Sequence, residues 1–323
     1  MKLTLISIVV LNSFASQLSA QQSNDCLGIA DPSSRLVCYD EKFGYSKSDN
    51  LNQAGEIAGK KSTVESKHVA DTGLSTYRPN YFLPYSYNRN RDTSLYPVSD
   101  LSYELNRPEA KFQISFKGPI WLDILNSDIN LWFGYTQVSF WQWFNTDLSS
   151  PFRESNYEPE AWFEQSFDYE LLDGWEIAKL RVGFNHQSNG QEELLSRSWN
   201  RVISSVEFER TFDSGANMRV NLKTWKRVSE PLDDDDNPDI SRYMGHSEIM
   251  GIYQFNDNEI TLMVRNFTSS RRGINFSWSF PILGSDHVKG YFQYFSGYGE
   301  SLIDYNHNNQ TIGIGFTISD WLK

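Results

Sequence analysis

The sequence predicts an all-β protein, an antiparallel transmembrane β-barrel of about twelve strands that follows a polar N-terminal extension. Three observations predict this fold. Short segments alternate between apolar and polar residues, as strands with one apolar face do. Tight turns and long polar loops follow one another between these segments. The chain also begins with an export signal, and no later apolar run is long enough for a transmembrane helix.

The first twenty residues are expected to be a secretory signal peptide. Lys2 is followed by an apolar run over residues 3–11, and the small residues Ser19 and Ala20 precede Gln21. This apolar run is too short to span a bilayer. The mature protein is therefore expected to be exported and to have no helical anchor.

Residues 21–76 are expected to form a periplasmic N-terminal extension that is partly disordered, because they are polar and show little periodicity. Both cysteines of the chain, Cys26 and Cys38, lie in this segment. In an exported protein such a pair predicts one disulfide that closes a short loop. A metal or redox pair is the alternative, and the absence of a neighbouring histidine in the sequence makes it the weaker one.

Residues 77–323 are expected to form the barrel domain. Segments between residues 81 and 320 number about twelve, an even number as bacterial barrels require, and each is long enough to cross a membrane at a tilt. The clearest alternation, with one face apolar and the other polar or small, occurs over residues 111–117, 218–223, 274–280 and 312–319.

The connections support a bacterial outer-membrane barrel, which has tight turns at one end and long loops at the other. Turns are expected near 173–174, 213–215, 256–258 and 284–285, and long loops over 145–156, 189–199, 229–242 and 296–310. Loop 268–272 is shorter than its place in this scheme predicts. A soluble β-sandwich is the alternative fold, but it does not require such regular alternation of loop lengths.

Composition excludes one class of partner and leaves others open. The net charge of −12 argues against nucleic acid, whose phosphates require a basic surface. The chain has 10 Trp, 17 Tyr and 21 Phe, which suit the aromatic girdles of a membrane barrel but also a carbohydrate-binding β-protein.

The most informative residues are His186 and Ser188, which lie two apart on one expected strand. They share its apolar side with Leu180, Val182 and Phe184, so in a transmembrane barrel they face lipid. If both termini are periplasmic, this is the fifth strand and the pair lies near the outer rim. The other side of this strand and the next is expected to form a polar network in the lumen, and this network comprises Asn185, Gln187, Arg201, Glu207 and Glu209.

These residue types suit acyl transfer. A serine hydroxyl becomes a nucleophile when a neighbouring base takes its proton, and His186 can act as that base. Asn200 begins the next strand on the same side, and its side-chain oxygen can fix the histidine tautomer. Backbone N–H groups of Ser188 and Gly190, or a cation, could stabilise the oxyanion. A His-x-Ser tripeptide alone is weak support, and a strand-end pair bonded to water in the loop is the plainer alternative.

The surrounding motifs resemble the outer-membrane phospholipase A family. The resemblance covers residues 77–323 and comprises NHQSNG at 185–190, SRSWNR at 196–201, SSPFRE at 149–154, NYEP at 156–159, DDNPDI at 235–240 and YGESLIDYN at 298–306.

This resemblance implies a twelve-stranded barrel in the bacterial outer membrane that hydrolyses acyl esters of phospholipids, with phospholipase A1/A2 and lysophospholipase activity. It implies Ser188 as nucleophile, His186 as general base and Asn200 as the residue that orients the histidine. It places this site at the outer leaflet, and it implies activation by homodimerisation. Gln137, an amide on a lipid-facing side, is then expected to bond across the dimer interface.

The resemblance also implies dependence on Ca²⁺. The ligands that carry over are the Ser196 hydroxyl, the backbone carbonyl of Gln191 and Ser149 of the facing protomer, while Asp236 matches a second calcium position. Gln191 departs from the family, where arginine is frequent at this position, but a backbone ligand tolerates the change. Hydroxyl and carbonyl oxygens are ligands that this hard cation prefers. Without the resemblance, ordinary hydrogen bonding within the loops would account for both serines.

Two other functions remain open at this stage. A non-enzymatic barrel, either a porin or a surface-binding protein, would share the fold, although charged lumen residues would tend to plug twelve strands. A soluble secreted esterase would share the chemistry and not the membrane. Asp233 and Asp234 are interpreted as solvated loop residues.

Overall fold

The computed structural model describes residues 73–92 and 105–319, apart from 232, 283, 286 and 287, together with Asp31, Arg35 and Cys38. The chain divides into two units, Met1–Glu65 and Ser66–Lys323. The predicted signal peptide, most of the predicted extension and Cys26 lie outside the described residues. Cys38 is in a disulfide. No helix among the described residues is long and apolar enough to span a membrane.

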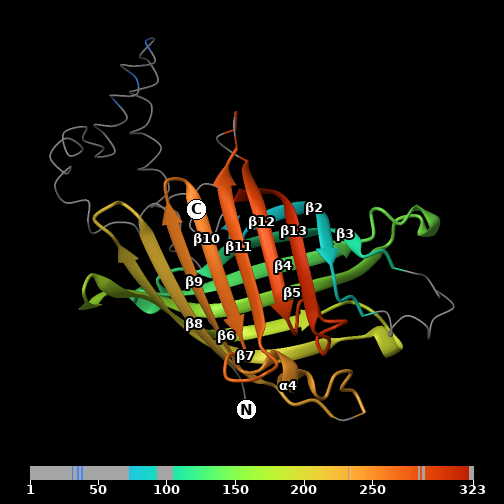
Figure 1. Cartoon of the computed structure of the whole chain (residues 1–323). Helices are drawn as coiled ribbons and strands as arrows, with labels where there is room; N and C mark the ends of the chain where they lie inside the picture. The colour runs from blue at the N-terminus through green and yellow to red at the C-terminus, as the bar shows by residue number, and fades with distance from the viewer. Residues whose placement is uncertain are drawn as a thin grey trace, which may run out of the picture. The chain divides into compact units, whose positions relative to one another are not determined.

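The second unit is a closed barrel of twelve antiparallel strands, as the sequence predicts (Figure 1). Each strand is hydrogen-bonded to the next along the chain from β2 to β13, and β13 pairs with β2, which closes the circuit. This closure excludes the β-sandwich. Two further residues, Ser75–Thr76, form β1 against β3 at the end of the predicted extension.

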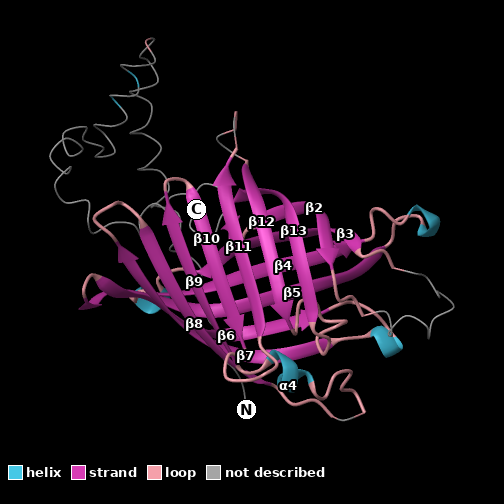
Figure 2. Cartoon of the chain, viewed as in Figure 1, coloured by secondary structure: helices cyan, strands magenta, loops and turns pink. Residues whose placement is uncertain are grey.

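The strands account for most of the described chain (Figure 2). Their bounds are β2 Asn80–Asn88, β3 Pro108–Trp121, β4 Ile129–Trp141, β5 Phe152–Leu172, β6 Trp175–Ser188, β7 Ser198–Thr211, β8 Asn217–Arg227, β9 Ser247–Phe255, β10 Asn258–Arg265, β11 Gly273–Pro281, β12 Lys289–Gly297 and β13 Asn309–Ser319. Between residues 73 and 319, the described helical pieces are short and lie in the connections: η1 Ile124–Asn126, η2 Thr146–Leu148, η3 Glu193–Leu195 and α4 Ile240–Met244.

The start of β5 differs from the sequence prediction. The predicted loop 145–156 ends early, because β5 begins at Phe152. Glu154 and Asn156 point into the barrel, where they accept hydrogen bonds from the backbone N–H groups of Ile303 and Leu302, each at 3.0 Å. The ladder with β4 reaches this end of the strand, because Phe152 pairs with Trp141 and Glu154 with Phe140. No local sequence pattern reveals this pairing or the contacts with the distant loop.

The lumen is filled by ion pairs and hydrogen bonds. Arg78 contacts Glu158 at 2.9 Å and Glu160 at 2.8 Å, and Arg153 contacts Glu109 at 3.0 Å. The predicted lumen residues take part: Asn185 donates to Glu158, Arg201 donates to Asn185, Gln187 accepts from Trp199, Glu207 pairs with Arg181 and Glu209 pairs with Arg219. Buried charges require such partners, and these contacts supply partners to the charged side chains named here.

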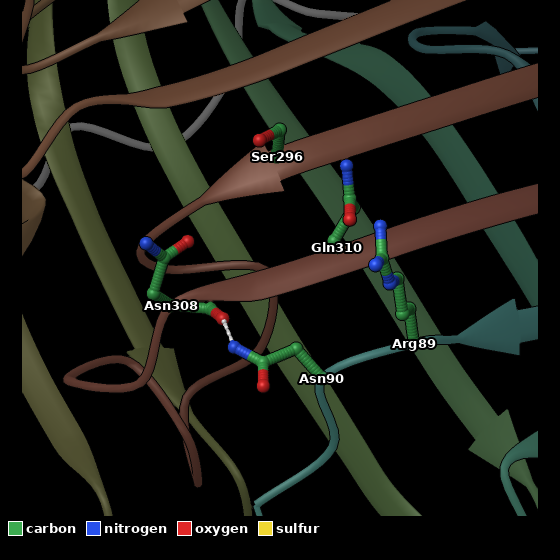
Figure 3. A pocket seen from close by; sticks show the side chains of 5 residues that line it. All are labelled: Arg89, Asn90, Ser296, Asn308 and Gln310. Atoms are coloured by element: carbon green, nitrogen blue, oxygen red, sulfur yellow. Dashed lines mark hydrogen bonds between the residues drawn. The ribbon is translucent and has the colours of Figure 1, made fainter.

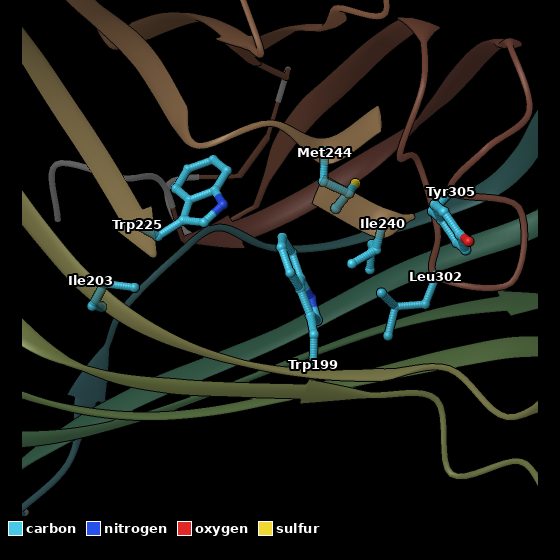
Figure 4. Packing of buried hydrophobic residues seen from close by; sticks show 7 residues of the cluster. All are labelled: Trp199, Ile203, Trp225, Ile240, Met244, Leu302 and Tyr305. Carbon is cyan, nitrogen blue, oxygen red and sulfur yellow. The ribbon is translucent and has the colours of Figure 1, made fainter. Parts of the chain in front are cut away.

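An apolar cluster closes the lumen at the long-loop end (Figure 4). It joins the inward sides of β7 and β8 to the loops that follow β8 and β12. Its members are Trp199, Ile203, Trp225, Ile240, Met244, Leu302 and Tyr305. Trp199, Ile240 and Leu302 are at most 1% exposed, so water is excluded from this layer. The two loops are therefore fixed above β6 and β7, where the candidate site lies.

Candidate active site

The outward side of β6 is apolar and exposed. Leu180, Val182 and Phe184 are 44%, 55% and 47% exposed, whereas the alternate residue Asn185 is fully buried in the lumen. The pairing of β6 with β7 continues without a shift from Lys179 to the end of the strand. His186 and Ser188 therefore share the outward side, as their spacing predicts.

His186 and Asn200 face each other across the β6–β7 ladder. The Nδ1 atom of His186 lies 2.8 Å from Oδ1 of Asn200. An amide oxygen can only accept, so Nδ1 carries the proton in this contact and Nε2 is left as a basic lone pair. The predicted orienting role of Asn200 is consistent with this geometry.

Ser188 is the last residue of β6, and it pairs with Tyr157 on β5 and with Ser198 on β7. It lies at the end of the strand from which the 189–197 loop departs. Ser188 and His186 are both half-buried, in contrast to the exposed apolar residues further down the same side. A substrate could thus reach them from the barrel exterior.

Glu230 contacts Asn200, although no pattern in the sequence marks this residue. The Nδ2 group of Asn200 donates to Oε1 of Glu230 at 3.0 Å. Oε2 of the same carboxylate lies 3.7 Å from Nη2 of Arg227. Glu230 reaches Asn200 through the pairing of β7 with β8: the N–H of Val228 donates to the carbonyl of Asn200 at 2.8 Å, which brings the end of β8 beside Asn200.

Asn189 shapes the loop between β6 and β7, and it is 3% exposed. Its backbone N–H donates to the carbonyl of Arg197 at 3.0 Å. Its Oδ1 accepts from the backbone N–H groups of Arg197 at 2.9 Å and of Gln191 at 3.3 Å. Gly190 follows with a φ of 64°, a left-handed conformation that glycine adopts without strain. The loop therefore folds back on itself, and Arg197, which follows Ser196, lies beside Asn189.

Two of the predicted calcium ligands meet in this loop region. The Ser196 hydroxyl donates to Oδ2 of Asp236 at 2.5 Å. Asp236 lies in the β8–α4 loop, and Arg227 holds this loop through its 2.6 Å contact with Asp235. Hydroxyl and carboxylate oxygens at the protein surface suit a hard cation, so the donor set fits calcium. Among the described residues no group of three or more His, Cys, Asp or Glu side chains could hold a metal.

The other two predicted calcium ligands, Gln191 and Ser149, are not in this contact between Ser196 and Asp236. The Gln191 backbone is fixed by Asn189, as described above, and its position is two residues before η3. Ser149 caps η2 in the β4–β5 loop with a φ of 58°, and its N–H donates to the carbonyl of Thr146 at 3.2 Å. Ser149 thus lies in a separate loop, on the other side of β5 from the β6–β7 loop.

Gln137 finds polar partners on its own strand. The Tyr135 hydroxyl donates to Oε1 of Gln137, and Nε2 of Gln137 donates to Oγ of Ser139, each at 3.0 Å. Ser139 in turn contacts Ser155 at 2.9 Å. The amide therefore has a partner at each end, and each end retains capacity for one more hydrogen bond.

A polar pocket of about 400 Å³ lies elsewhere on the barrel (Figure 3). It is lined by Arg89, Asn90, Ser296, Asn308 and Gln310, and Nδ2 of Asn90 donates to the carbonyl of Asn308. These residues lie at the ends of β2, β12 and β13. Strands β3–β5 on one side and β8–β11 on the other separate them from β6 and β7. The pocket is therefore distinct from the His186–Asn200 site.

Comparison with known proteins gives consistent matches over the barrel. The family model described as phospholipase A1 matches residues 59–318. The phospholipase A1 of Klebsiella pneumoniae is 36% identical over 248 residues, which cover 76% of this chain and 82% of that protein. The structure of outer membrane phospholipase A from Escherichia coli matches with a TM-score of 0.71 and 36% identity, over 77% of this chain and 93% of that one. The outer membrane phospholipase of Salmonella typhi, solved as a dimer with bound calcium, matches with a TM-score of 0.71 and 35% identity over the same shares.

Proposed function

The chain belongs to the phospholipase A1 family of bacterial outer-membrane barrels, and from this membership we propose that Ser188, His186 and Asn200 carry out its hydrolysis of phospholipid acyl esters. The chain is a phospholipase of the outer membrane. The observation that carries the assignment of the site is the 2.8 Å contact between His186 and Asn200 on the outward side of the barrel. The exposed apolar residues below the pair support a substrate that approaches from the membrane with its acyl chain along β6.

The reaction begins when Nε2 of His186 takes the proton of the Ser188 hydroxyl. Oγ of Ser188 attacks the ester carbonyl, and a tetrahedral oxyanion forms. Its collapse breaks the ester bond, and the imidazolium returns the proton to the departing alcohol oxygen of the lysophospholipid. A water molecule, deprotonated by His186, then attacks the acyl-enzyme. The bond between the acyl carbon and Oγ of Ser188 breaks, the imidazolium returns its proton to Oγ, and the fatty acid leaves. Asn200 keeps Nδ1 protonated throughout, so only Nε2 gains and loses a proton.

Two groups would support the oxyanion. The proposed donors are the backbone N–H groups of Ser188, the last residue of β6, and of Gly190 in the turn that follows. Calcium is proposed as the cofactor, held by the Ser196 hydroxyl, the Gln191 carbonyl and the partner's Ser149, with Asp236 as the ligand in a single barrel. When bound, the ion supplies positive charge that stabilises the oxyanion.

We also propose that homodimerisation activates the enzyme. Ser149 comes from a different loop than Ser196 and Gln191, which accords with a ligand set shared between two chains. Gln137 would bond with its counterpart across the interface through the free capacity of its amide. A dimer would also add a second wall to the groove for the acyl chain. The porin alternative gains no support, because ion pairs and an apolar cluster occupy the lumen.

The test is fatty-acid release from phospholipid vesicles by purified, reconstituted protein in the presence of Ca²⁺. Ser188→Ala is expected to lower kcat by about 10⁴-fold or more, as loss of a triad nucleophile does. Ser204→Ala is the matched control, because Ser204 is an exposed serine on the next strand whose hydroxyl contacts Thr224. Full activity in Ser188→Ala, or no release by the unmodified protein, would reject the proposal.

A further inference from the structure

The carboxylate of Glu230 lies between two donor groups at the proposed active site, the neutral amide of Asn200 and the charged guanidinium of Arg227. One oxygen, Oε1, accepts from Nδ2 of Asn200 at 3.0 Å, and the other, Oε2, lies 3.7 Å from the Arg227 guanidinium. Its side chain is 19% exposed. The contact thus sits in a partly dehydrated position, where a hydrogen bond to a charged acceptor is stronger than one exposed to water.

We propose that Glu230 is a positioning residue of this enzyme: it fixes the orientation of the Asn200 amide and, through that amide, the tautomer of His186. The proposal rests on the proposed function of His186 as the general base. An asparagine alone cannot dictate the tautomer, because a rotation of its amide by half a turn exchanges oxygen and nitrogen. With the nitrogen toward His186, Nδ1 would become the acceptor and Nε2 would carry the proton, so the base would be lost.

A carboxylate resolves this ambiguity, because ionised Glu230 only accepts hydrogen bonds. Nδ2 of Asn200 must then point toward Glu230, and Oδ1 is left to face His186 at 2.8 Å. Nδ1 of His186 is consequently protonated and Nε2 is free to take the Ser188 proton. Glu230 also places a negative charge near the imidazole, with the uncharged Asn200 amide between them. This charge favours the imidazolium that forms during the reaction.

Two features of the fold hold Glu230 in this place, the pairing of Val228 with Asn200 and the contact with Arg227. The N–H of Val228 donates to the carbonyl of Asn200, which extends the β7–β8 ladder by one residue toward Glu230. Arg227 contacts the Glu230 carboxylate, the Asp235 carboxylate at 2.6 Å and the carbonyl of Asn237 at 3.1 Å. Glu230 is therefore anchored by an arginine that is itself anchored by the following loop.

The first test compares kinetics of single and double variants in reconstituted, Ca²⁺-saturated protein. Glu230→Ala is expected to lower kcat about 10–100-fold with little change in KM, the range seen when a supporting hydrogen-bond partner is removed. Glu230→Gln keeps an acceptor oxygen for Asn200 and is expected to recover part of the loss. Asp233→Asn, which removes one charge from the same loop, is the matched control and is expected to leave kcat unchanged.

The double variant shows whether Glu230 acts through Asn200. In the Asn200→Ala background, Glu230→Ala is expected to have no further effect on kcat, because the amide that it orients is gone. Independent, multiplying losses in the double variant would overturn the proposal. A rise in the Ca²⁺ concentration needed for half-maximal activity in Glu230→Ala would also overturn it, since the residue would then act through the calcium loop.

A second readout does not depend on activity. Histidine labelled with ¹⁵N distinguishes the two neutral tautomers by NMR, and the His186 signals are identified as those missing from His186→Ala. The unmodified protein is expected to show a protonated Nδ1, and Glu230→Ala a mixture of both tautomers. An unchanged tautomer in Glu230→Ala would overturn the proposal even if the enzyme is active. The unmodified protein could also prove inactive while Glu230→Ala still shows the expected mixture of tautomers. That result would reject the proposed function and leave the orienting role of Glu230 intact.

Discussion

The histidine partner at this site is an uncharged asparagine, and its surroundings explain why the amide suits the position. The Asn200 amide must accept from His186 on one side and donate to Glu230 on the other, at 2.8 Å and 3.0 Å. An aspartate could serve His186, but it has no donor for Glu230. The identity of residue 200 is thus coupled to that of residue 230.

A first prediction follows for Asn200→Asp. Two carboxylates would lie side by side near His186, and such a pair cannot readily ionise together near neutral pH. We expect kcat to fall by about tenfold or more, although aspartate is the usual orienting residue in related triads. The double variant Asn200→Asp with Glu230→Gln is expected to regain activity, because the amide introduced at position 230 can donate to the new carboxylate. Steady-state hydrolysis of a phospholipid measures both, and a double variant no better than Asn200→Asp would refute the coupling.

A second prediction concerns the oxygen ligands at Ser196 and Asp236. These side chains are in contact at 2.5 Å and their loops are positioned by Asn189 and Arg227. We expect Ser196→Ala and Asp236→Asn each to raise the Ca²⁺ concentration for half-maximal activity by about tenfold, and chelation to abolish hydrolysis. Calcium titrations of activity measure this effect. Asp234→Asn serves as control, and an equal shift in that variant would indicate a general charge effect of the acidic run.

At the scale of elements, the loops at the long-loop end act as structural parts of the barrel. The loop between β12 and β13 places Leu302 in the apolar cluster, and its backbone binds Glu154 and Asn156 on β5. Tyr305 ties this loop to the β8–α4 loop through a hydrogen bond from its hydroxyl to Asp239. The pKa of Tyr305 is raised above its ordinary value, chiefly by burial and secondly by this contact with the Asp239 carboxylate.

A third prediction uses this tether. Tyr305→Phe is expected to lower the free energy of unfolding by about 1–2 kcal/mol near pH 8, because a buried hydrogen bond to a carboxylate is lost. Since the folded state raises the pKa of Tyr305, its contribution is fully present below about pH 10 and declines as the pH rises further. Urea unfolding at pH 8, 10 and 11 should therefore show a difference in the free energy of unfolding between Tyr305→Phe and the unmodified protein, and this difference should narrow only at the highest pH. A difference that is constant across this range would contradict the assignment.

The elements also show what the sequence could and could not predict. Alternating residues such as Leu180, Val182 and Phe184 predict both the strand and its outward side, because the period of two is a local property. Position 230 could not be predicted as part of the site. Glu230 lies outside the regular strands in an acidic, loop-like segment, and only the pairing of β7 with β8 brings it to Asn200. The early start of β5 at Phe152 is likewise nonlocal, since it depends on pairing with β4.

At the scale of the whole molecule, the twelve strands and the polar lumen agree with the sequence prediction because both depend on alternation summed over many segments. Ser196 and Asp236 are 40 residues apart and nonetheless meet. The family motifs assign both residues to calcium, in two different positions, and only the fold shows that their side chains are in contact. The proposed contribution of the partner's Ser149 and the activation by dimerisation remain predictions, since they depend on a second chain.

A fourth prediction tests the dimer. The Gln137 amide has one partner at each end within its own chain, Tyr135 and Ser139, and can form a further bond on the membrane-facing surface. Polar contacts between membrane segments contribute on the order of 1 kcal/mol. Gln137→Leu is therefore expected to raise the dimer dissociation constant roughly fivefold. Sedimentation equilibrium in detergent with Ca²⁺ measures this constant. Unchanged dimerisation would remove Gln137 from the interface.

The central claim is that Ser188 is a nucleophile that His186 activates on the membrane-facing side of the barrel. Its most direct test is covalent labelling of the reconstituted protein by two fluorophosphonates with the same reactive group, one with a long alkyl chain and dissolved in the bilayer, the other small and charged in water. Peptide mass spectrometry then locates the adduct. The claim predicts an adduct on Ser188 that forms fastest with the bilayer-dissolved reagent and is lost in His186→Ala. Adducts at another residue, or labelling of Ser188 that is independent of His186, would contradict it.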